Sequence, residues 1–413
     1  MSYNFLVASW GGPGHLGPTL TAARQLRARG HDVRFIARAD ARTQVEAAGF
    51  RFATWQRTAH FSPIARTSDP IEYACDNLLF GPAAAQGADV SDEIRRATTD
   101  GVLVDTALFG AVLAAEAERV PCALLSPTVS LRPLPGQPPI GSGLPAPRTP
   151  EERAAVEAAT SRFVAVLNEW LPMLNVARAS LQLAPSSHVL ELFDRPARFL
   201  IAMSAAFDFA PDFLPGNVRY IGPLLDSSDW SKPWISPWSH EPNRPRALIS
   251  FSTTNQDQTD ALQRTINAIG SVEMDAVVTL GPAVEETTLH APDNVTLLPS
   301  APHDAIMKEA SLVVTHGGHG TVSRSLAHGL PLLVMPFGRD QGDIAARVEA
   351  RGLGLILPPT AAEAEIAAAI TRLIREPQFL IAARQFRDIM TAEVSGAPLV
   401  GELEAIVRAG ANA

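Results

Sequence analysis

The chain is poor in cysteine and has no long hydrophobic run. Only Cys75 and Cys122 occur among its 413 residues, too few for a disulfide framework or a cysteine zinc site. Its longer uncharged apolar stretches, 107–115 and 199–207, fall well short of the roughly 20 residues that cross a membrane. The apolar run 5–10 follows no basic segment and breaks at a Gly-Gly-Pro turn, so we expect no signal peptide. These absences predict a cytoplasmic protein without an integral membrane segment.

The charge of the chain is moderately acidic, which bears on its partners. The sequence has 34 basic and 43 acidic residues, a formal net charge of −9, and no basic block. We therefore expect no nucleic-acid partner. Hydrophobic residues make up 46% and charged residues 19% of the chain, a composition typical of globular rather than disordered proteins. The length predicts two or three domains.

Short apolar runs alternate with alanine-rich segments of helical spacing. The runs in the first half, each typical of a strand buried on both faces, are 5–9, 33–37, 102–105, 123–126 and 199–202. Between the first two, the segment 16–29 has apolar residues at helical spacing, a proline in its first turn and a glycine after its end. A strand, a helix and a second strand in this order predict parallel strands and a right-handed crossover.

The same alternation restarts after residue 245. The expected elements are strands at 247–251, 276–280, 295–298, 312–315 and 332–335, with helices at 257–269 and 341–351. The stretch 226–245 is rich in Ser, Pro and Trp, as interdomain linkers often are. We predict an α/β protein in which 1–225 and 246–413 are two doubly wound, Rossmann-like parallel-sheet domains. Their strands should end at a central cleft, where such sheets bind ligands.

The segment 131–150 is rich in proline and glycine but lies inside the first predicted domain. A loop of that length within a domain is usually functional or mobile. A disordered insertion fits the same composition.

The most informative motif is Val-Val-Thr-His-Gly-Gly-His-Gly-Thr at 313–321. A predicted strand ends at Thr315, and glycines lead from it into a helix. Glycines let backbone N–H groups approach a ligand closely, and a helix N-terminus favours an anion. His316 can donate a further hydrogen bond to a phosphate. An ordinary tight turn between strand and helix would have the same glycine pattern.

Asp340 and Gln341 follow the next predicted strand. Side by side, these two residues can accept from and donate to vicinal sugar hydroxyls. Asp340 could equally be a simple N-cap, since a predicted helix begins there.

Two polar residues follow predicted strands in the first half. His15 lies in the turn between the first strand and the first helix, and a histidine pKa near physiological pH suits a general base. Asp105 ends the strand 102–105 and could accept the other ring N–H, which would stabilise the imidazolium. The plain structural alternatives are a surface or core histidine and a helix N-cap.

The stretch 302–348 resembles the nucleotide-sugar-binding signature of family 1 glycosyltransferases. Nearly the whole chain is similar to their bacterial natural-product and macrolide-type branch, because the Gly-His-x-x-Pro turn, a middle Asp motif and this signature occur in the expected order. The resemblance implies the GT-B fold, with a last helix that packs back on the N-terminal domain. It also implies an inverting enzyme that moves a sugar from a UDP- or dTDP-sugar to a hydroxyl of a small hydrophobic acceptor. We expect no metal or other cofactor, since no Asp-x-Asp triplet is present.

The resemblance assigns roles to individual residues. It makes His15 the general base and Asp105 its partner. The residues assigned to the donor diphosphate are His316, Gly318, His319, Gly320, Thr321, Ser252 and Thr253. Those assigned to the sugar are Asp340 and Gln341, and those assigned to the nucleoside are Pro302, His303 and Arg324. Acceptor contacts are predicted from the loops 60–87 and 131–150, with Trp10, Phe61, Phe80, Leu131 and Leu134 as candidates, although a packed tryptophan fits Trp10 equally well.

The sequence departs from the family at two positions. Arg324 stands where many members have a glutamate that accepts from ribose hydroxyls, and Ile344 stands where asparagine is usual. Because arginine has only donors, the donor could be a deoxyribonucleotide, or other groups could hold a UDP ribose.

Three alternatives to this function stay open. A lipid or cell-wall glycosyltransferase would need a membrane-docking face, of which the acidic balance gives no sign. A non-catalytic nucleotide-sugar-binding partner would not need both His15 and Asp105. A nucleotide-sugar epimerase would not need the signature at 302–348.

Overall fold

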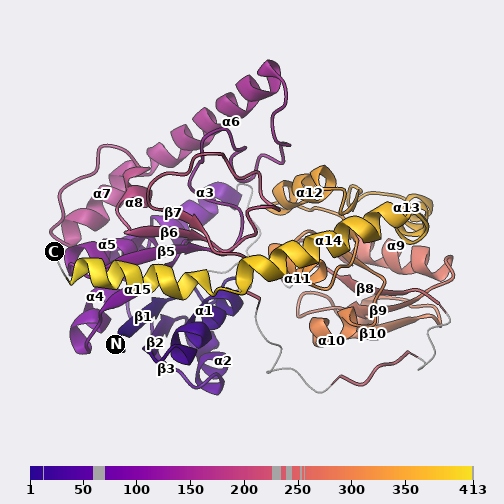
Figure 1. The fold of residues 1–413 in the computed structure, drawn as a ribbon, viewed down its shortest axis with the longest axis horizontal. Coiled ribbons are helices and arrows are strands. Elements are labelled where there is room, and N and C mark those ends of the chain that lie inside the picture. Colours follow the sequence, from indigo (N-terminus) through magenta and orange to yellow (C-terminus); the bar gives the residue numbers. More distant parts are fainter. Residues whose placement is uncertain are drawn as a thin grey trace.

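The protein is described by a computed structural model that covers residues 1–12, 14–58, 70–225, 234–238, 244–251, 254 and 256–411. Two parallel β-sheets form its two halves, which lie side by side (Figure 1). The first sheet has the order β3-β2-β1-β4-β5-β6-β7. Its strands are β1 Asn4–Ala8, β2 Asp32–Ala37, β3 Arg51–Thr54, β4 Gly101–Asp105, β5 Cys122–Ser126, β6 Arg198–Ile201 and β7 Val218–Tyr220.

The second sheet has the order β10-β9-β8-β11-β12-β13. Its strands are β8 Arg246–Ser250, β9 Asp275–Thr279, β10 Val295–Leu298, β11 Leu312–Thr315, β12 Leu332–Val334 and β13 Gly354–Ile356. All ten predicted strands are present within a residue or two of their expected bounds. The sequence analysis missed β3, β7 and β13, and each of these lies at the edge of its sheet.

Helices cover both sheets (Figure 1). Those of the first half are α1 Leu16–Ala28, α2 Arg42–Ala47, α3 Pro70–Ala74, α4 Ala83–Arg96, α5 Phe109–Ala117, α6 Pro150–Glu169, α7 Leu171–Ser180 and α8 Glu191–Asp194. Those that follow are α9 Thr259–Gly270, α10 His303–Met307, α11 His319–Ala327, α12 Gln341–Ala350, α13 Glu363–Arg375, α14 Pro377–Val394 and α15 Pro398–Gly410. Three short turns of other helical types are η1 Ala39–Ala41, η2 Cys75–Leu79 and η3 Glu286–Thr288.

Burial on both faces explains why the strands are continuously apolar. Along β1, Leu6 packs in one apolar cluster with residues of α4 and α5. Its neighbours Phe5 and Val7 point the other way, into a second cluster with α1 and α15. Each such fully buried side chain stabilises the fold by roughly 1.5–3 kcal/mol relative to an exposed one.

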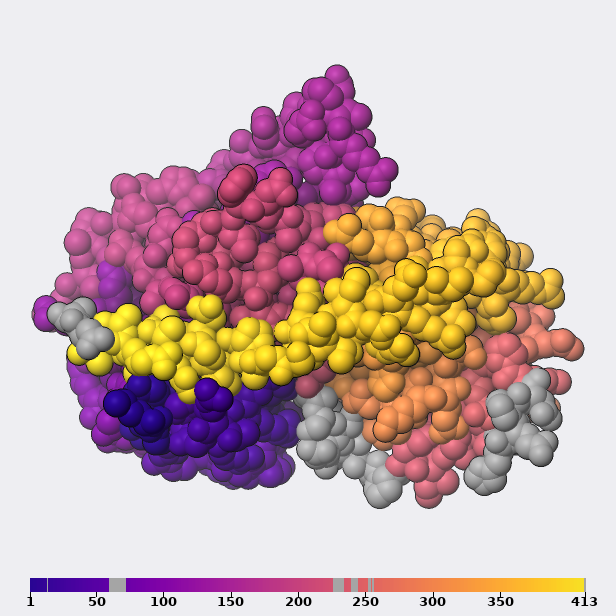
Figure 2. Space-filling view, viewed as in Figure 1, coloured from indigo at the N-terminus to yellow at the C-terminus, as the bar shows by residue number. Residues whose placement is uncertain are grey.

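The last two helices join the halves. Helix α14 packs on α11 and α13, whereas α15 packs on α1, β4, β5 and β6. Leu399, Leu403 and Ile406 of α15 are buried in the cluster under the first sheet. The two helices meet at Ala397, whose φ of 43° breaks the helix. In Figures 1 and 2 they form one yellow band across the molecule.

Candidate active site

The first group of site residues follows β1 and β4, which are neighbours in the sheet. The Nδ1 atom of His15 lies 2.9 Å from Oδ1 and 3.0 Å from Oδ2 of Asp105. Asp105 is buried and also accepts from the backbone N–H groups of Trp10 and Ala107. These bonds fix the carboxylate, so it holds the Nδ1–H of His15 and leaves Nε2 as the atom that can take a proton.

Opposing effects act on the pKa of His15. Burial of the ring lowers this pKa, but the charge and hydrogen bond of Asp105 raise it, and the charge of Asp340 raises it further. The net result is a pKa above the ordinary value of 6.5. His15 is therefore neutral, and able to act as a base, only toward the alkaline side of that value.

This balance predicts the acid limb of the pH profile. In the wild-type protein, kcat/KM should fall as the pH drops through an apparent pKa above 6.5, because His15 becomes protonated. Asp105→Asn removes the charge that raises this pKa, so the limb should move to lower pH while turnover also falls. Kinetics from pH 5 to 9 test this. An unchanged limb in Asp105→Asn would mean that another group titrates.

The second group lies at the N-terminus of α11. Helix α11 begins at His319, so the N–H groups of its first residues, with Gly320 and Thr321, have no acceptor within the helix. A Cβ on Gly318 would lie 2.7 Å from Nε2 of His316, which explains why glycine is needed there. His316 bonds to the backbone of Ser250, and burial lowers its pKa to about 4. A neutral His316 beside free amides forms a site for an anion.

The loop that follows β5 in the first half contacts this second group of residues in the second half. The Oγ1 of Thr128 donates to Oδ2 of Asp340 at 2.6 Å. Asp340 stands at the N-cap position of α12 but makes no side-chain cap bond, so it is not the simple cap that the sequence allows. The ring of His319 lies against the carbonyl of Pro127, 2.8 Å away, and accepts from Ser323. Both ring nitrogens of His319 therefore have protein partners, one of them in the first half, and the backbone N–H is the group of His319 that can face a diphosphate.

Gln341 differs most from its predicted role. Its Oε1 accepts from the N–H groups of Phe337 and Gly338, and its Nε2 donates to Gln256 at 2.8 Å. The residue is only 2% exposed. Because both ends of the amide bind protein, Gln341 shapes the loop that precedes α12 and does not present its side chain to a sugar in this structure.

The predicted loop 131–150 contains neither helix nor strand before α6 begins at Pro150, and it is held by α12. Oδ2 and Oδ1 of Asp343 accept from the N–H groups of Gly141 and Gly143 at 2.6 and 2.8 Å. The loop ends at a capping box in which Thr149 and Glu152 exchange hydrogen bonds before α6. The loop is thus part of the junction between the halves and not a disordered insertion.

The residues assigned to the nucleoside lie around α10. Pro302 is its N-cap, and Nε2 of His303 lies 3.0 Å from Oγ1 of Thr279. Arg324 forms an ion pair with Asp304, which also lies 3.1 Å from Nε2 of His328. Partial burial raises the pKa of Asp304, but the hydrogen bond with His328 and the charge of Arg324 outweigh it, so the net pKa is lowered. This carboxylate is therefore charged and already occupied.

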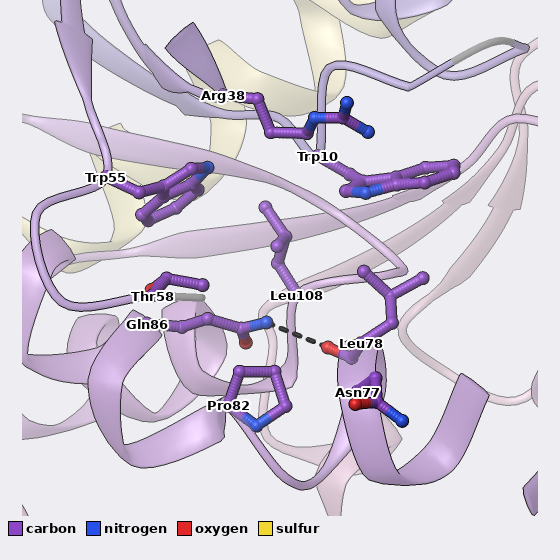
Figure 3. Close-up of a pocket in the computed structure, with 9 residues that line it drawn as sticks. All are labelled: Trp10, Arg38, Trp55, Thr58, Asn77, Leu78, Pro82, Gln86 and Leu108. Carbon is purple, nitrogen blue, oxygen red and sulfur yellow. Dashed lines mark hydrogen bonds between the residues drawn. The ribbon is translucent and has the colours of Figure 1, made fainter. Parts of the chain in front are cut away.

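A pocket lies at the carboxyl edge of the first sheet (Figure 3). It is shallow, because the space that it offers to a water-sized molecule is only about 20 Å³. The residues that line it are Trp10, Arg38, Trp55, Thr58, Asn77, Leu78, Pro82, Gln86 and Leu108. Of the predicted acceptor residues that the structure describes, Trp10 lines this pocket, whereas Phe80, Leu131 and Leu134 do not.

The other acceptor candidates are placed differently. Phe80 is completely buried between Phe109 and Trp170, and Leu134 is 3% exposed, so both belong to the core. Leu131 packs against the same core with part of its surface exposed. The sequence analysis placed these residues on the surface because it cannot tell which way an apolar side chain points. Phe61, Ser252 and Thr253 lie outside the described residues.

Several site residues were missed by the sequence analysis. Thr128 and Trp55 lie in loops and Asp343 lies in the first turn of α12, and the partners of Thr128 and Asp343 are far away in the sequence. Thr128 could have drawn attention only because it follows the predicted strand 123–126. No pattern signals the other two.

Neither a metal-binding cluster nor a membrane-spanning helix occurs among the described residues. No group of three His, Cys, Asp or Glu residues in the described ranges is arranged to hold a metal ion. Within the same ranges, no helix is long and apolar enough to cross a membrane.

Comparison with known proteins identifies the class. The model of the erythromycin biosynthesis protein CIII-like C-terminal domain matches residues 263–406. The chain is 26% identical to 4'-demethylrebeccamycin synthase of Lentzea aerocolonigenes, over 98% of this chain and 100% of that protein. It is 29% identical to 3-alpha-mycarosylerythronolide B desosaminyl transferase of Saccharopolyspora erythraea, over 43% of each chain. The glycosyltransferase VinC, solved with dTDP, superimposes with a TM-score of 0.73 at 20% identity, over 98% of this chain and 100% of that one.

The two parallel sheets and their structural neighbours define the GT-B fold, as the resemblance in the sequence implied. The chain is similar to the family 1 glycosyltransferases of the natural-product, macrolide type. It is accordingly an enzyme that uses nucleotide-sugar donors.

Proposed function

We propose that the protein is an inverting, metal-independent glycosyltransferase that moves a sugar from a UDP- or dTDP-sugar to a hydroxyl of a small hydrophobic natural product. His15 serves as the general base. The residues 1–225 carry the acceptor and 246–413 carry the donor. The name of one relative contains an erythronolide, which supports this class of acceptor, and VinC was solved with dTDP, which supports this class of donor.

One observation carries the proposal. The charge of the Asp340 carboxylate acts on both histidines: it adds to the rise in the pKa of His15, and it offsets part of the lowering that burial causes in the pKa of His316. Such an effect requires proximity, so the candidate base and the candidate diphosphate ligand lie around one space. A sugar at Asp340 would have the acceptor base on one side and the leaving group on the other.

The chemistry follows from this placement. Nε2 of His15 takes the proton of the acceptor hydroxyl, while Asp105 stabilises the imidazolium that forms. The hydroxyl oxygen attacks the anomeric carbon opposite the departing diphosphate, which inverts that centre. The amides at the start of α11 and His316 stabilise the charge that develops on the diphosphate, so no metal is required.

Release of nucleoside diphosphate tests the proposal. UDP-glucose and dTDP-glucose are incubated with and without a panel of hydroxyl-bearing aromatic and macrolide acceptors, in EDTA. We expect acceptor-dependent release and a product with the inverted anomeric configuration. Release that needs added Mg²⁺, or a retained configuration, would contradict the mechanism.

Asp340 should select the sugar rather than the nucleotide. Asp340→Ala is expected to weaken dTDP-glucose by about 10-fold, the effect of one hydrogen bond to a charged group, and dTDP much less. Gln341→Ala should weaken both ligands, since Gln341 holds the loop. Calorimetry with the two ligands measures this. Equal loss of both ligands in Asp340→Ala would show that Asp340 supports the fold instead.

The pair of Arg324 and Asp304 should relax discrimination between nucleotides. Arginine cannot accept from a ribose hydroxyl, and the nearby carboxylate of Asp304 is already bound to Arg324 and His328. We expect dTDP to bind at least as tightly as UDP, within about 1 kcal/mol. Competition of the two diphosphates against one labelled donor measures the ratio. A preference for UDP of about 100-fold would show that another group reads the ribose.

A further inference from the structure

We infer that Asp343 is a positioning residue, which ties the first turn of α12 to a loop of the first half and so fixes Asp340 where the donor sugar binds. The placement of the sugar then depends on the acceptor half as well as on the donor half. This inference rests on the proposed function and adds to it a residue that acts through Asp340.

Helix α12 lies on the side of its half that faces the first half (Figure 1). Four of its charged residues bind loops of the first half. They are spaced by three or four residues, as neighbours on one helix face are, and they are Asp340, Asp343, Arg347 and Arg351. The loop between β5 and α6 supplies the partners of the first two, and Asp208 after β6 binds both arginines. The helix is therefore held by the first half at both of its ends.

Asp343 binds the loop with both of its carboxylate oxygens. They accept from the N–H groups of Gly141 and Gly143 at 2.6 and 2.8 Å, and Asp343 is only 2% exposed. The backbones of helix and loop also meet, because a Cβ on Gly342 would lie 3.5 Å from Cα of Gly143. An acidic residue in a first turn can stabilise a helix by its charge alone, but that role needs no partner in another half. The two bonds fix the loop and the start of α12 against each other.

The loop is in turn fixed to the first half near its start and at its end. Arg132 donates to the carbonyl of Phe193 and to the side chain of Asn217. It also pairs with Asp194 at 2.7 Å. At the other end, Thr149 forms the capping box that begins α6. A loop held in this way carries the position of the first half to α12.

Asp340 lies one turn before Asp343 and depends on the same loop. Burial raises the pKa of Asp343, the two amide bonds lower it, and the charge of Asp340 adds to the net rise, which requires the two carboxylates to lie close together. Asp340 makes no capping bond within α12 and accepts from Thr128 of the loop at 2.6 Å. Both carboxylates at the start of α12 are thus held by the segment between β5 and α6. Release of Asp343 would let the first turn move, and a misplacement of about 1 Å can cost about 100-fold in rate.

An isosteric variant tests the inference. Asp343→Asn keeps the shape of the side chain but turns an NH₂ group toward one of the two loop amides. With dTDP-glucose and a phenolic acceptor, we expect kcat to fall about 10-fold, because the sugar is no longer held in line. The affinity for dTDP-glucose should fall about 3- to 10-fold and that for dTDP by no more than about 2-fold, since dTDP has no sugar hydroxyl for Asp340. Asp343→Glu keeps the carboxylate and should recover part of kcat.

A double variant tests whether Asp343 acts through Asp340. Asp340→Ala/Asp343→Asn should bind dTDP-glucose as weakly as Asp340→Ala and no more weakly, because no carboxylate remains to be placed. Glu349→Gln removes an exposed carboxylate from the same helix. This control should match the wild type in kcat and in both affinities.

Three results would overturn the inference. They are unchanged kcat and affinities in Asp343→Asn, equal weakening of dTDP-glucose and dTDP, and a full further loss in the double variant. If Asp343→Asn melts earlier than the wild type, calorimetry below its melting temperature still gives both affinities, and their ratio decides. Absence of transfer to every acceptor by the wild type would contradict the proposed function instead, and the same ratio would still decide on Asp343.

Discussion

His15→Ala should reduce sugar transfer to hydroxyl acceptors by about 10²- to 10⁴-fold, the usual contribution of a general base. Its Nδ1 is held by Asp105 at 2.9 Å, so the variant loses both the proton acceptor and the charge pair that stabilises it. Binding of dTDP should change little, because the predicted diphosphate ligands lie on the other half. Steady-state turnover and calorimetry with dTDP measure the two properties separately.

Two results for His15→Ala would contradict this expectation. Wild-type turnover would remove His15 from the mechanism. Loss of dTDP affinity in parallel with turnover would mean that His15 holds the halves together rather than reacting. Thr19→Ser, which removes a buried methyl group from the same helix and keeps the hydroxyl, serves as a control for damage to α1.

The second large effect concerns a buried ion pair between the halves. Nε of Arg347 lies 2.6 Å from Oδ1 of Asp208, and the two side chains are 1% and 0% exposed. Tyr220 also donates to this aspartate. Removing one partner leaves an uncompensated buried charge, so Arg347→Met should lower the free energy of unfolding by about 3–5 kcal/mol.

Urea denaturation measures this loss. The double variant Asp208→Asn/Arg347→Met should be more stable than Arg347→Met, because it no longer buries a lone carboxylate. Arg372→Gln breaks an exposed pair with Glu376 and should leave the midpoint unchanged. An unchanged midpoint in Arg347→Met would show that water compensates the aspartate.

The sequence predicts the central strands better than the edges for a physical reason. Central strands are buried on both faces and read as continuous apolar runs, as at Phe5–Ala8. The edge strand β3 is exposed or half-buried along its whole length, and β7 and β13 have only three residues each. Such short and partly polar segments carry no period from which a strand can be recognised.

The site divides in the same way. The sequence could point to His15, Asp105, His316 and Asp340 because the strand before each of them is recognisable. Within each sheet, parallel strands bring the residues that follow them to the same edge. The orientation of a side chain could not be found. Gln341 turns back into its own loop and toward Gln256. Phe80 turns into the core, where its ring partners Phe109 and Trp170 are remote in the sequence.

The helix α15 has a consequence for engineering. Its apolar face completes the core beneath the first sheet, although it comes after every strand of the second. The half that holds His15 is therefore assembled from two pieces of chain, one at each end. A hybrid enzyme made by joining the halves of two relatives at the linker would place a foreign helix on this sheet. Donor exchange between such enzymes requires two junctions, the second of them near Ala397, where α14 gives way to α15.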